Sequence, residues 1–164
     1  MSTNLQILQT DDKEAKYKAL IPQLEALIGA ETDFIANMAN TAAALRQTFG
    51  FFWVGFYVVK EGELVLAPFQ GPVACTRISY GKGVCGSAWE KGETIIVPDV
   101  ENFPGHIACN AQSKSEIVVP LIFNGIVTGV LDIDSDCLNC FVEIDRFFLE
   151  IICDLLIAKS NVSL

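Results

Sequence analysis

The dipeptide Asn124-Gly125 separates two apolar runs, residues 117–123 and 126–133. Both turn residues accept the positive φ angles that a two-residue type I′ turn requires, so the pattern predicts an antiparallel β-hairpin. Such a turn sets the register of its strands, and side chains along each strand then alternate between two faces. The chain is therefore expected to contain an antiparallel sheet with this hairpin in it.

Two helices are expected before the first strand. Asp11 and Glu14 form a capping-box pattern, and apolar residues then recur at helical spacing as far as Gly29. A second helical pattern follows and ends at Gly50. The sequence thus predicts an N-terminal helix over about residues 11–29, with a second helix after it.

Further strands are indicated by aromatic and β-branched residues between turn signals. They are expected at residues 51–59, 63–68, 74–78 and 94–97, with a short helix at 83–89 and a long loop at 98–115. Long loops inside compact domains often carry function. Loop 98–115 is therefore a candidate functional segment.

A C-terminal amphipathic helix is predicted from Val142 onward. Its apolar stripe comprises Phe147, Phe148, Ile151, Ile152, Leu155 and Leu156, and Asp145, Glu150 and Asp154 occupy the polar positions around it. No repeat or linker interrupts the 164 residues. The order of elements predicts one α+β domain, residues 1–164 with a core at about 33–158, built on a central antiparallel sheet of about six strands with helices packed on it.

The formal net charge of −9, from 20 acidic and 11 basic residues, opposes binding to nucleic acid or to an anionic membrane surface. The N-terminus lacks the pattern of a secretory signal, and no apolar run reaches the ~20 residues of a membrane span. We therefore expect a cytoplasmic protein that keeps its 6 cysteines reduced. Those cysteines would be catalytic, metal-binding or simply buried.

Cys109 is the first candidate for chemistry, because it lies in the long loop, where a thiol is exposed enough to react. The alternative is a small buried side chain, as for most free cysteines. His106, three residues earlier, is a candidate for lowering the thiol pKa, although single histidines often have no such role.

Cys75 and Cys85 are the candidate partners of Cys109. Cys75 falls in the predicted strand 74–78, and Cys85 begins the predicted short helix, whose N-terminus favours a thiolate. Either residue is a candidate to resolve an oxidised Cys109, and either is equally well explained as an inert core residue.

Cys137 and Cys140 form a C-x-x-C pattern, which is typical of half a zinc site or of a redox pair. No second half with matching spacing exists in the sequence. We therefore expect no metal site and interpret the pattern as an incidental feature of a loop.

Three carboxylates are predicted to meet on the hairpin. Asp132 and Asp134 share one strand face, and Glu116 begins the partner strand. Such a cluster raises at least one pKa and makes a proton donor available near neutral pH. For Asp134, and for Asp136 beyond it, a solvated strand end explains the sequence equally well.

Trp53, Gly55 and Tyr57 share one face of the first predicted strand. The two aromatic side chains are candidates for the wall of an apolar pocket, and a core position is the alternative interpretation.

These features resemble the free methionine-R-sulfoxide reductases, a family of single GAF domains. The resemblance covers about residues 33–156, and its motifs are Gly-Pro-Val-Ala-Cys (71–75), Gly-Val-Cys-Gly (83–86), Cys109 with Ser-Lys-Ser-Glu-Ile-Val-Val-Pro (113–120), and Gly-Val-Leu-Asp-Ile-Asp-Ser (129–135). The order and spacing of the three cysteines are the specific part. The last two segments are general to GAF domains.

The resemblance implies an enzyme that reduces free L-methionine-(R)-sulfoxide to methionine. Cys109 would attack the sulfur and become a sulfenic acid, and Cys75 or Cys85 would then form a disulfide that thioredoxin reduces, with thioredoxin reductase and NADPH behind it. The implied substrate-binding residues are Glu116, Asp132, Asp134, Trp53 and Tyr57. No bound cofactor is implied, and a homodimer is one option for the assembly.

Two other functions remain open from the sequence alone. A GAF fold also suits a sensory module that binds a small molecule such as a cyclic nucleotide without catalysis, because one fold hosts many functions. A scaffold protein whose cysteines are unreactive is the third hypothesis. Reactive thiols would argue against it.

Overall fold

A computed structural model describes residues 4–162 of the chain. The elements are α1 (Lys13–Ile28), α2 (Phe34–Phe49), β1 (Trp53–Lys60), β2 (Glu63–Gln70), β3 (Arg77–Ser79), α3 (Gly83–Lys91), β4 (Ile95–Val97), a 3-10 helix η1 (Val100–Asn102), β5 (Ser115–Phe123), β6 (Ile126–Ser135) and α4 (Glu143–Lys159). The predicted loop 98–115 thus contains one short helical turn, η1.

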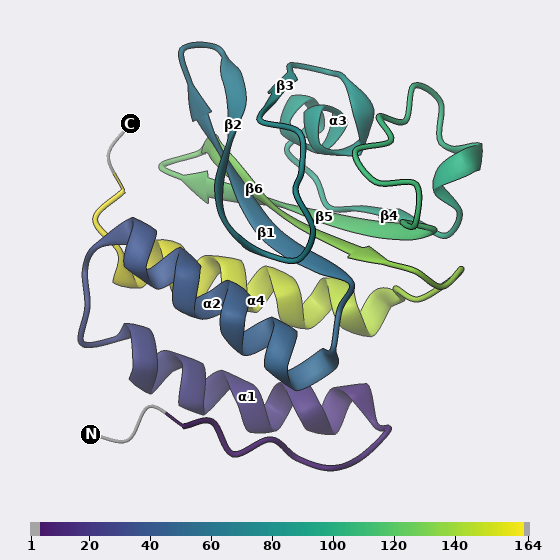
Figure 1. The fold of residues 1–164 in the computed structure, drawn as a ribbon. Coiled ribbons are helices and arrows are strands. Elements are labelled where there is room, and N and C mark those ends of the chain that lie inside the picture. Colours follow the sequence, from purple (N-terminus) through teal and green to yellow (C-terminus); the bar gives the residue numbers. More distant parts are fainter. Residues whose placement is uncertain (1–3, 163–164) are drawn as a thin grey trace.

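Six strands form one sheet in the order β3-β2-β1-β6-β5-β4, and every neighbouring pair is antiparallel. Figure 1 shows α2 and α4 against one face of this sheet, with α1 packed beneath them and α3 on the opposite face. The α+β class and the antiparallel sheet with helices on it are confirmed.

The β5–β6 hairpin confirms the prediction from Asn124-Gly125. Asn124 and Gly125 have φ angles of 51° and 77°, as a type I′ turn requires. The register set by the turn shifts by one residue between Leu121 and Ile122, and this shift places Glu116 opposite Asp134 and Val118 opposite Asp132.

Two apolar clusters cover the two faces of the sheet. The larger cluster combines α1, α2 and α4 with one face of the strands and includes Leu131 and Ile133. The smaller cluster lies under α3 and includes Trp53, Tyr57 and Cys85. Because strand side chains alternate, Asp132, which lies between Leu131 and Ile133, points to the α3 face.

The start of α1 differs from the prediction by one residue. Its N-cap is Asp12 and not Asp11, since the Asp12 carboxylate accepts a hydrogen bond of 3.2 Å from the backbone N–H of Ala15. Glu14 is then one position too close to the cap to complete a capping box.

The prediction that Cys75 lies in a strand is wrong. β3 begins only at Arg77, and the preceding segment is irregular. The physical reason is that two of its carbonyl groups accept hydrogen bonds from side chains and not from a strand. The Tyr57 hydroxyl donates to the carbonyl of Cys75 at 2.9 Å, and the Trp53 indole N–H donates to that of Pro72 at 3.0 Å.

The expectation that Asp145 lies on the polar face of the last helix is also wrong, because its side chain is fully buried. Its carboxylate accepts hydrogen bonds from Lys13 Nζ at 2.7 Å, from the Tyr17 hydroxyl at 2.9 Å and from the Val142 backbone N–H at 2.9 Å. A local periodicity cannot reveal this, because both side-chain donors belong to α1, more than 120 residues earlier.

The predicted apolar stripe of α4 is wider than the part of the helix that packs against the sheet. Phe148 and Ile152 are buried in the larger cluster, whereas Phe147 is 60% exposed and Ile151 is 36% exposed. The helix therefore packs on the sheet as expected, but with only part of its predicted stripe.

Within residues 4–162, no helix is both long enough and apolar enough to cross a membrane.

The buried Asp145 should contribute strongly to stability. We expect Asp145→Ala to lower the free energy of unfolding by about 3 kcal/mol, because the buried Tyr17 hydroxyl loses its acceptor and Lys13 loses its counter-charge. Urea unfolding would measure the change. Asp154→Ala on the exposed side of the same helix is the matched control and should change the value by less than about 0.5 kcal/mol; equal losses in both variants would contradict this account.

Candidate active site

A pocket lies on the α3 face of the sheet, opposite the larger apolar cluster. Its cavity volume is about 40 Å³, enough for only a few water molecules. The residues around it include Trp53, Tyr57, Cys85, Cys109, Glu116, Asp132 and Asp134. Of the proposed site residues, Cys75 alone is outside this lining, and its disulfide joins it to Cys109.

The floor of the pocket is formed by three carboxylates from the β5–β6 hairpin. Glu116 is 5% exposed and Asp132 is 7% exposed, whereas Asp134 is half-buried. Direct pairing of Glu116 with Asp134, together with alternation along β6, brings all three carboxylates to one face. The predicted carboxylate cluster is thus present in the fold.

Burial and mutual repulsion shift the proton equilibria of this cluster. Burial raises the pKa of Asp132 to about 6. It also raises the pKa of Glu116 well above its usual value, and the neighbouring charges of Asp132 and Asp134 add to that rise. The pKa of Asp134 is raised by burial first and by Asp132 second. The cluster therefore holds protons near neutral pH, as a proton donor must.

One oxygen of Asp132 is left without a partner. Asp132 Oδ1 is buried and accepts no hydrogen bond. A buried acceptor without a donor costs about 1–3 kcal/mol, so a ligand that donates a hydrogen bond here would gain that energy back.

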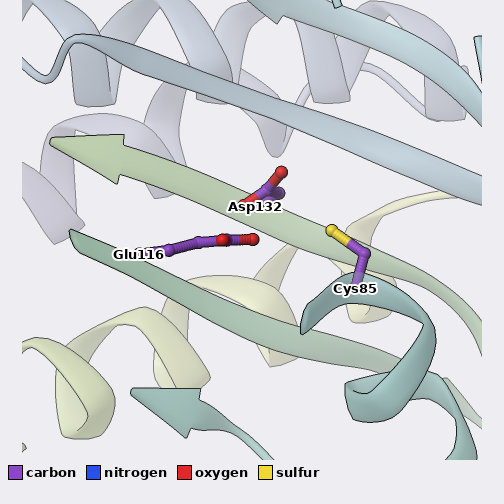
Figure 2. A group of neighbouring side chains, drawn as sticks. All are labelled: Cys85, Glu116 and Asp132. Atoms are coloured by element: carbon purple, nitrogen blue, oxygen red, sulfur yellow. The ribbon is translucent and has the colours of Figure 1, made fainter. Parts of the chain in front are cut away.

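Cys85 approaches the carboxylates from α3 (Figure 2). It is the third residue of that helix and is 3% exposed. Burial raises the pKa of its thiol well above the usual value, and the charges of Asp132 and Glu116 raise it further. The expectation that the helix N-terminus favours a thiolate at Cys85 is therefore wrong, because desolvation and two adjacent carboxylates outweigh the helix dipole.

A disulfide joins Cys75 to Cys109, with their Cα atoms 5.5 Å apart. Both residues lie in irregular segments, Cys75 before β3 and Cys109 in the loop before β5, and Cys109 is exposed. The fold thus pairs Cys109 with Cys75 and leaves Cys85 as a free thiol.

Trp53 and Tyr57 form one wall of the pocket, and their stacked rings lie 6.1 Å apart. Their hydrogen bonds to the carbonyls of Pro72 and Cys75 also tie the Cys75 segment to β1. The same two side chains therefore shape the pocket and position one cysteine of the disulfide.

Glycine makes room for the Trp53 ring. A Cβ atom at Gly55 would lie 2.6 Å from Trp53 Cη2 and 2.3 Å from the Cβ of Phe69, and one at Gly71 would lie 2.7 Å from Trp53 Cδ1. Real Cβ atoms essentially never come so close to other atoms. The Trp53 ring can therefore adopt its observed position only because residues 55 and 71 have no side chain.

His106 lies next to a carboxylate. Its Nε2 is 3.7 Å from Glu116 Oε2, and burial lowers its pKa, so the imidazole favours its neutral form. A direct effect of His106 on the Cys109 thiol stays a prediction.

Cys137 and Cys140 lie outside the pocket, in the turn between β6 and α4. Their backbone is held by Ser115, whose hydroxyl donates to the Cys137 carbonyl at 2.6 Å and accepts from the Cys140 N–H at 3.3 Å. Both thiols are free.

Residues that the sequence did not single out also line the pocket, among them Phe52, Lys82 and Asn110. Asn110 belongs to loop 98–115, so the length of that loop was the one available signal. Phe52 and Lys82 gave no signal, because neither belongs to a motif.

The fold and the pocket define a GAF domain. The sequence profile described as "GAF domain" matches residues 31–156. GAF domain-containing protein A of Dictyostelium discoideum is 59% identical over 157 residues, which are 95% of this chain and 99% of that protein.

Two further relatives define the family more narrowly. The free methionine-R-sulfoxide reductase of Escherichia coli (strain K12) is 44% identical over 136 residues, covering 82% of each chain. The X-ray structure of the free methionine-R-sulfoxide reductase of Neisseria meningitidis in complex with its substrate is 51% identical, covers 96% of this chain and 95% of that one, and superposes with a TM-score of 0.94. The chain belongs to the free methionine-R-sulfoxide reductase family of GAF-domain oxidoreductases.

A methyl group at position 55 should disturb the aromatic wall. We expect Gly55→Ala to lower the free energy of unfolding by about 1–3 kcal/mol and to change the tryptophan emission spectrum, because the new Cβ collides with Phe69 and Trp53. Urea unfolding followed by fluorescence measures both effects.

Gly50→Ala is the control for this variant, since Gly50 has a φ of +68° and no atom within 4 Å of an added Cβ. It should cost about 1 kcal/mol of backbone strain and leave the emission unchanged. An unchanged spectrum in Gly55→Ala would show that this crowding is absent.

Proposed function

We propose that this protein reduces free L-methionine-(R)-sulfoxide to methionine with its own thiols. The observation that supports this most strongly is the Cys75–Cys109 disulfide beside a pocket floored by three carboxylates, two of them buried. The names of the relatives at 44–51% identity point to the same substrate.

In the proposed reaction, the Cys109 thiolate attacks the sulfoxide sulfur. One proton is taken up as the sulfoxide oxygen passes to Cys109 and becomes the hydroxyl of a cysteine sulfenic acid, and methionine leaves as the thioether. The Cys75 thiolate then attacks the Cys109 sulfur, a disulfide forms and water departs. One sulfoxide is reduced, and two thiols are oxidised to one disulfide.

Cys75 is the proposed resolving cysteine because it is the residue bonded to Cys109 in this fold. Cys85 is less suited to that role. It is buried, and the raised pKa of its thiol keeps it protonated and poorly nucleophilic.

The carboxylates have two proposed tasks. Glu116, whose pKa burial raises well above its usual value, supplies a proton to the sulfoxide oxygen. Asp132, with its unpartnered Oδ1, and Asp134 bind the ammonium group of the free amino acid. A methionine within a polypeptide lacks that ammonium group, so the pocket would select the free amino acid.

Trp53 and Tyr57 would enclose the methyl group of the substrate. Their aromatic faces line the same pocket as the carboxylates and offer apolar contact without competing for the ammonium group. The acidic floor also opposes a phosphate-bearing ligand, which disfavours the cyclic-nucleotide module.

The proposed reductant is a dithiol protein of the thioredoxin type. Cys109 is exposed, so its sulfur is accessible to an external thiolate. The electrons would come from NADPH through thioredoxin reductase. Such a cycle requires a reducing compartment, which agrees with a cytoplasmic location.

The decisive experiment counts thiols. Reduced protein is mixed with free L-methionine-(R)-sulfoxide, with the S epimer in parallel, and free thiols and methionine are measured. Loss of two thiols per methionine formed, with the R epimer only, supports the proposal. No thiol loss and no methionine would refute it.

Substitutions should separate the two cysteines. Cys109→Ser should lower turnover by at least about 1000-fold, because the nucleophile is gone. Cys75→Ser should release one methionine per protein in the first turnover and then stall as a sulfenic acid, which a dimedone adduct would reveal by mass. Cys153→Ser, which alters a buried thiol in the opposite cluster, is the control and should keep full turnover. Sustained thioredoxin-dependent turnover by Cys75→Ser would exclude Cys75 as the resolving residue.

Loss of the Asp132 charge should weaken recognition of the ammonium group. We expect Asp132→Asn to lower kcat/KM roughly 100-fold, since the ammonium group would lose a buried charged partner. This factor corresponds to a loss of about 3 kcal/mol of transition-state stabilisation. N-acetyl methionine sulfoxide, which lacks the positive charge, should be a poor substrate for both proteins. If Asp132→Asn lowered kcat/KM for free and acetylated substrate by the same factor, the residue would not bind the ammonium group.

A further inference from the structure

Cys85, Glu116 and Asp132 come from three different elements and meet in the pocket. Figure 2 shows the three side chains pointing toward one another from α3, β5 and β6. One ligand atom of each, the Cys85 sulfur and a carboxylate oxygen of Glu116 and of Asp132, lies within 4.8 Å of the others. All three residues are buried.

This cluster has a surplus of acidic groups. Among the ion pairs of residues 4–162, none joins a lysine or arginine to Glu116 or Asp132. Glu116 and Cys85 hydrogen-bond to the Asp132 carboxyl group, but its buried Oδ1 has no hydrogen-bond partner. A cation placed between the groups would satisfy this oxygen and remove the mutual repulsion.

We propose that Cys85, Glu116 and Asp132 together bind one zinc ion. Zinc accepts both thiolate and carboxylate ligands, whereas magnesium and calcium bind oxygen ligands and make no use of a thiolate. Three protein ligands with a fourth position left open form the arrangement of an accessible zinc site rather than of a closed structural one.

The geometry needs little adjustment for zinc. At zinc–ligand distances of about 2.0–2.3 Å, tetrahedral ligand atoms lie roughly 3.3–3.8 Å apart, so atoms already within 4.8 Å must move by about an ångström. Zinc would replace the protons that the buried thiol and carboxyl groups hold.

Zinc at this position would inhibit the enzyme, a consequence that rests on the proposed function. The ion would occupy Asp132, the residue assigned to the substrate ammonium group, and would take up the proposed proton donor Glu116. The binding itself involves neither Cys75 nor Cys109 and is independent of turnover.

The test uses the folded protein with its Cys75–Cys109 disulfide intact, so that neither of those sulfurs binds metal. Cys137 and Cys140 are changed to serine in the background protein, which removes the other closely spaced pair of free thiols. Zinc affinity is measured by competition with a chromophoric chelator, and cobalt(II) serves as a spectroscopic probe of thiolate ligation.

The background protein should bind one zinc ion and, with cobalt, show a thiolate-to-metal charge-transfer band. Cys85→Ala should abolish the band and weaken zinc binding by at least about 100-fold, since even the loss of an outer-shell partner costs 10–100-fold. Cys153→Ala, which removes the other buried free thiol, should retain both. Absence of a zinc ion in the background protein, or unchanged binding in Cys85→Ala, would overturn the proposal.

Competition with free methionine locates the ion. The affinity for methionine is first measured without metal. Methionine at concentrations that fill the pocket should then weaken zinc binding in proportion to its occupancy. An unchanged zinc affinity at those concentrations would overturn the proposed position of the ion. If the reduced protein did not reduce free L-methionine-(R)-sulfoxide, yet the oxidised protein showed the Cys85-dependent cobalt band, the proposed function would be contradicted while the zinc site would be supported.

Discussion

The pairing of β5 with β6 is the constraint on which the site depends. It places Glu116 opposite Asp134 and puts both on the same face as Asp132, so that three carboxylates share a buried pocket. Such crowding is costly. Leu131 and Ile133, which alternate with the two aspartates, lie in the larger apolar cluster on the opposite face. Burial of that face, roughly 1.5–3 kcal/mol for each large aliphatic side chain, offsets the cost and holds the carboxylates together.

The disulfide depends on a second set of contacts. Trp53 and Tyr57 stand on β1, next to β6 in the sheet, and their polar atoms bond to the carbonyls of Pro72 and Cys75. The wall of the pocket and the position of one cysteine are therefore coupled through the same two side chains. In this arrangement, a change at Trp53 or Tyr57 affects both the shape of the pocket and the placement of Cys75.

Much of the fold could be predicted because its signals are local. Asn124-Gly125 specified its hairpin, and Gly50 ended α2 with a φ of 68°. The errors concern residues whose partners are distant in the sequence. Cys75 was assigned to a strand although its carbonyl bonds to Tyr57, 18 residues away, and Asp145 was placed on a polar face although its donors lie in α1. Periodicity records neither contact, because it reports only neighbouring residues.

The sequence by itself determined that Asp132 and Asp134 would share one face, since strand alternation follows from adjacent residues. The structure decided that Glu116 joins them, because the ladder shifts register between Leu121 and Ile122 and so pairs Glu116 with Asp134. The sequence also presented three cysteines without deciding which two would bond. Only the tertiary structure brought Cys109 to Cys75 and placed Cys85 beside Glu116 and Asp132. Those proximities arise from how α3 and two irregular segments pack over the sheet, and packing between distant segments depends on the whole core rather than on local spacing.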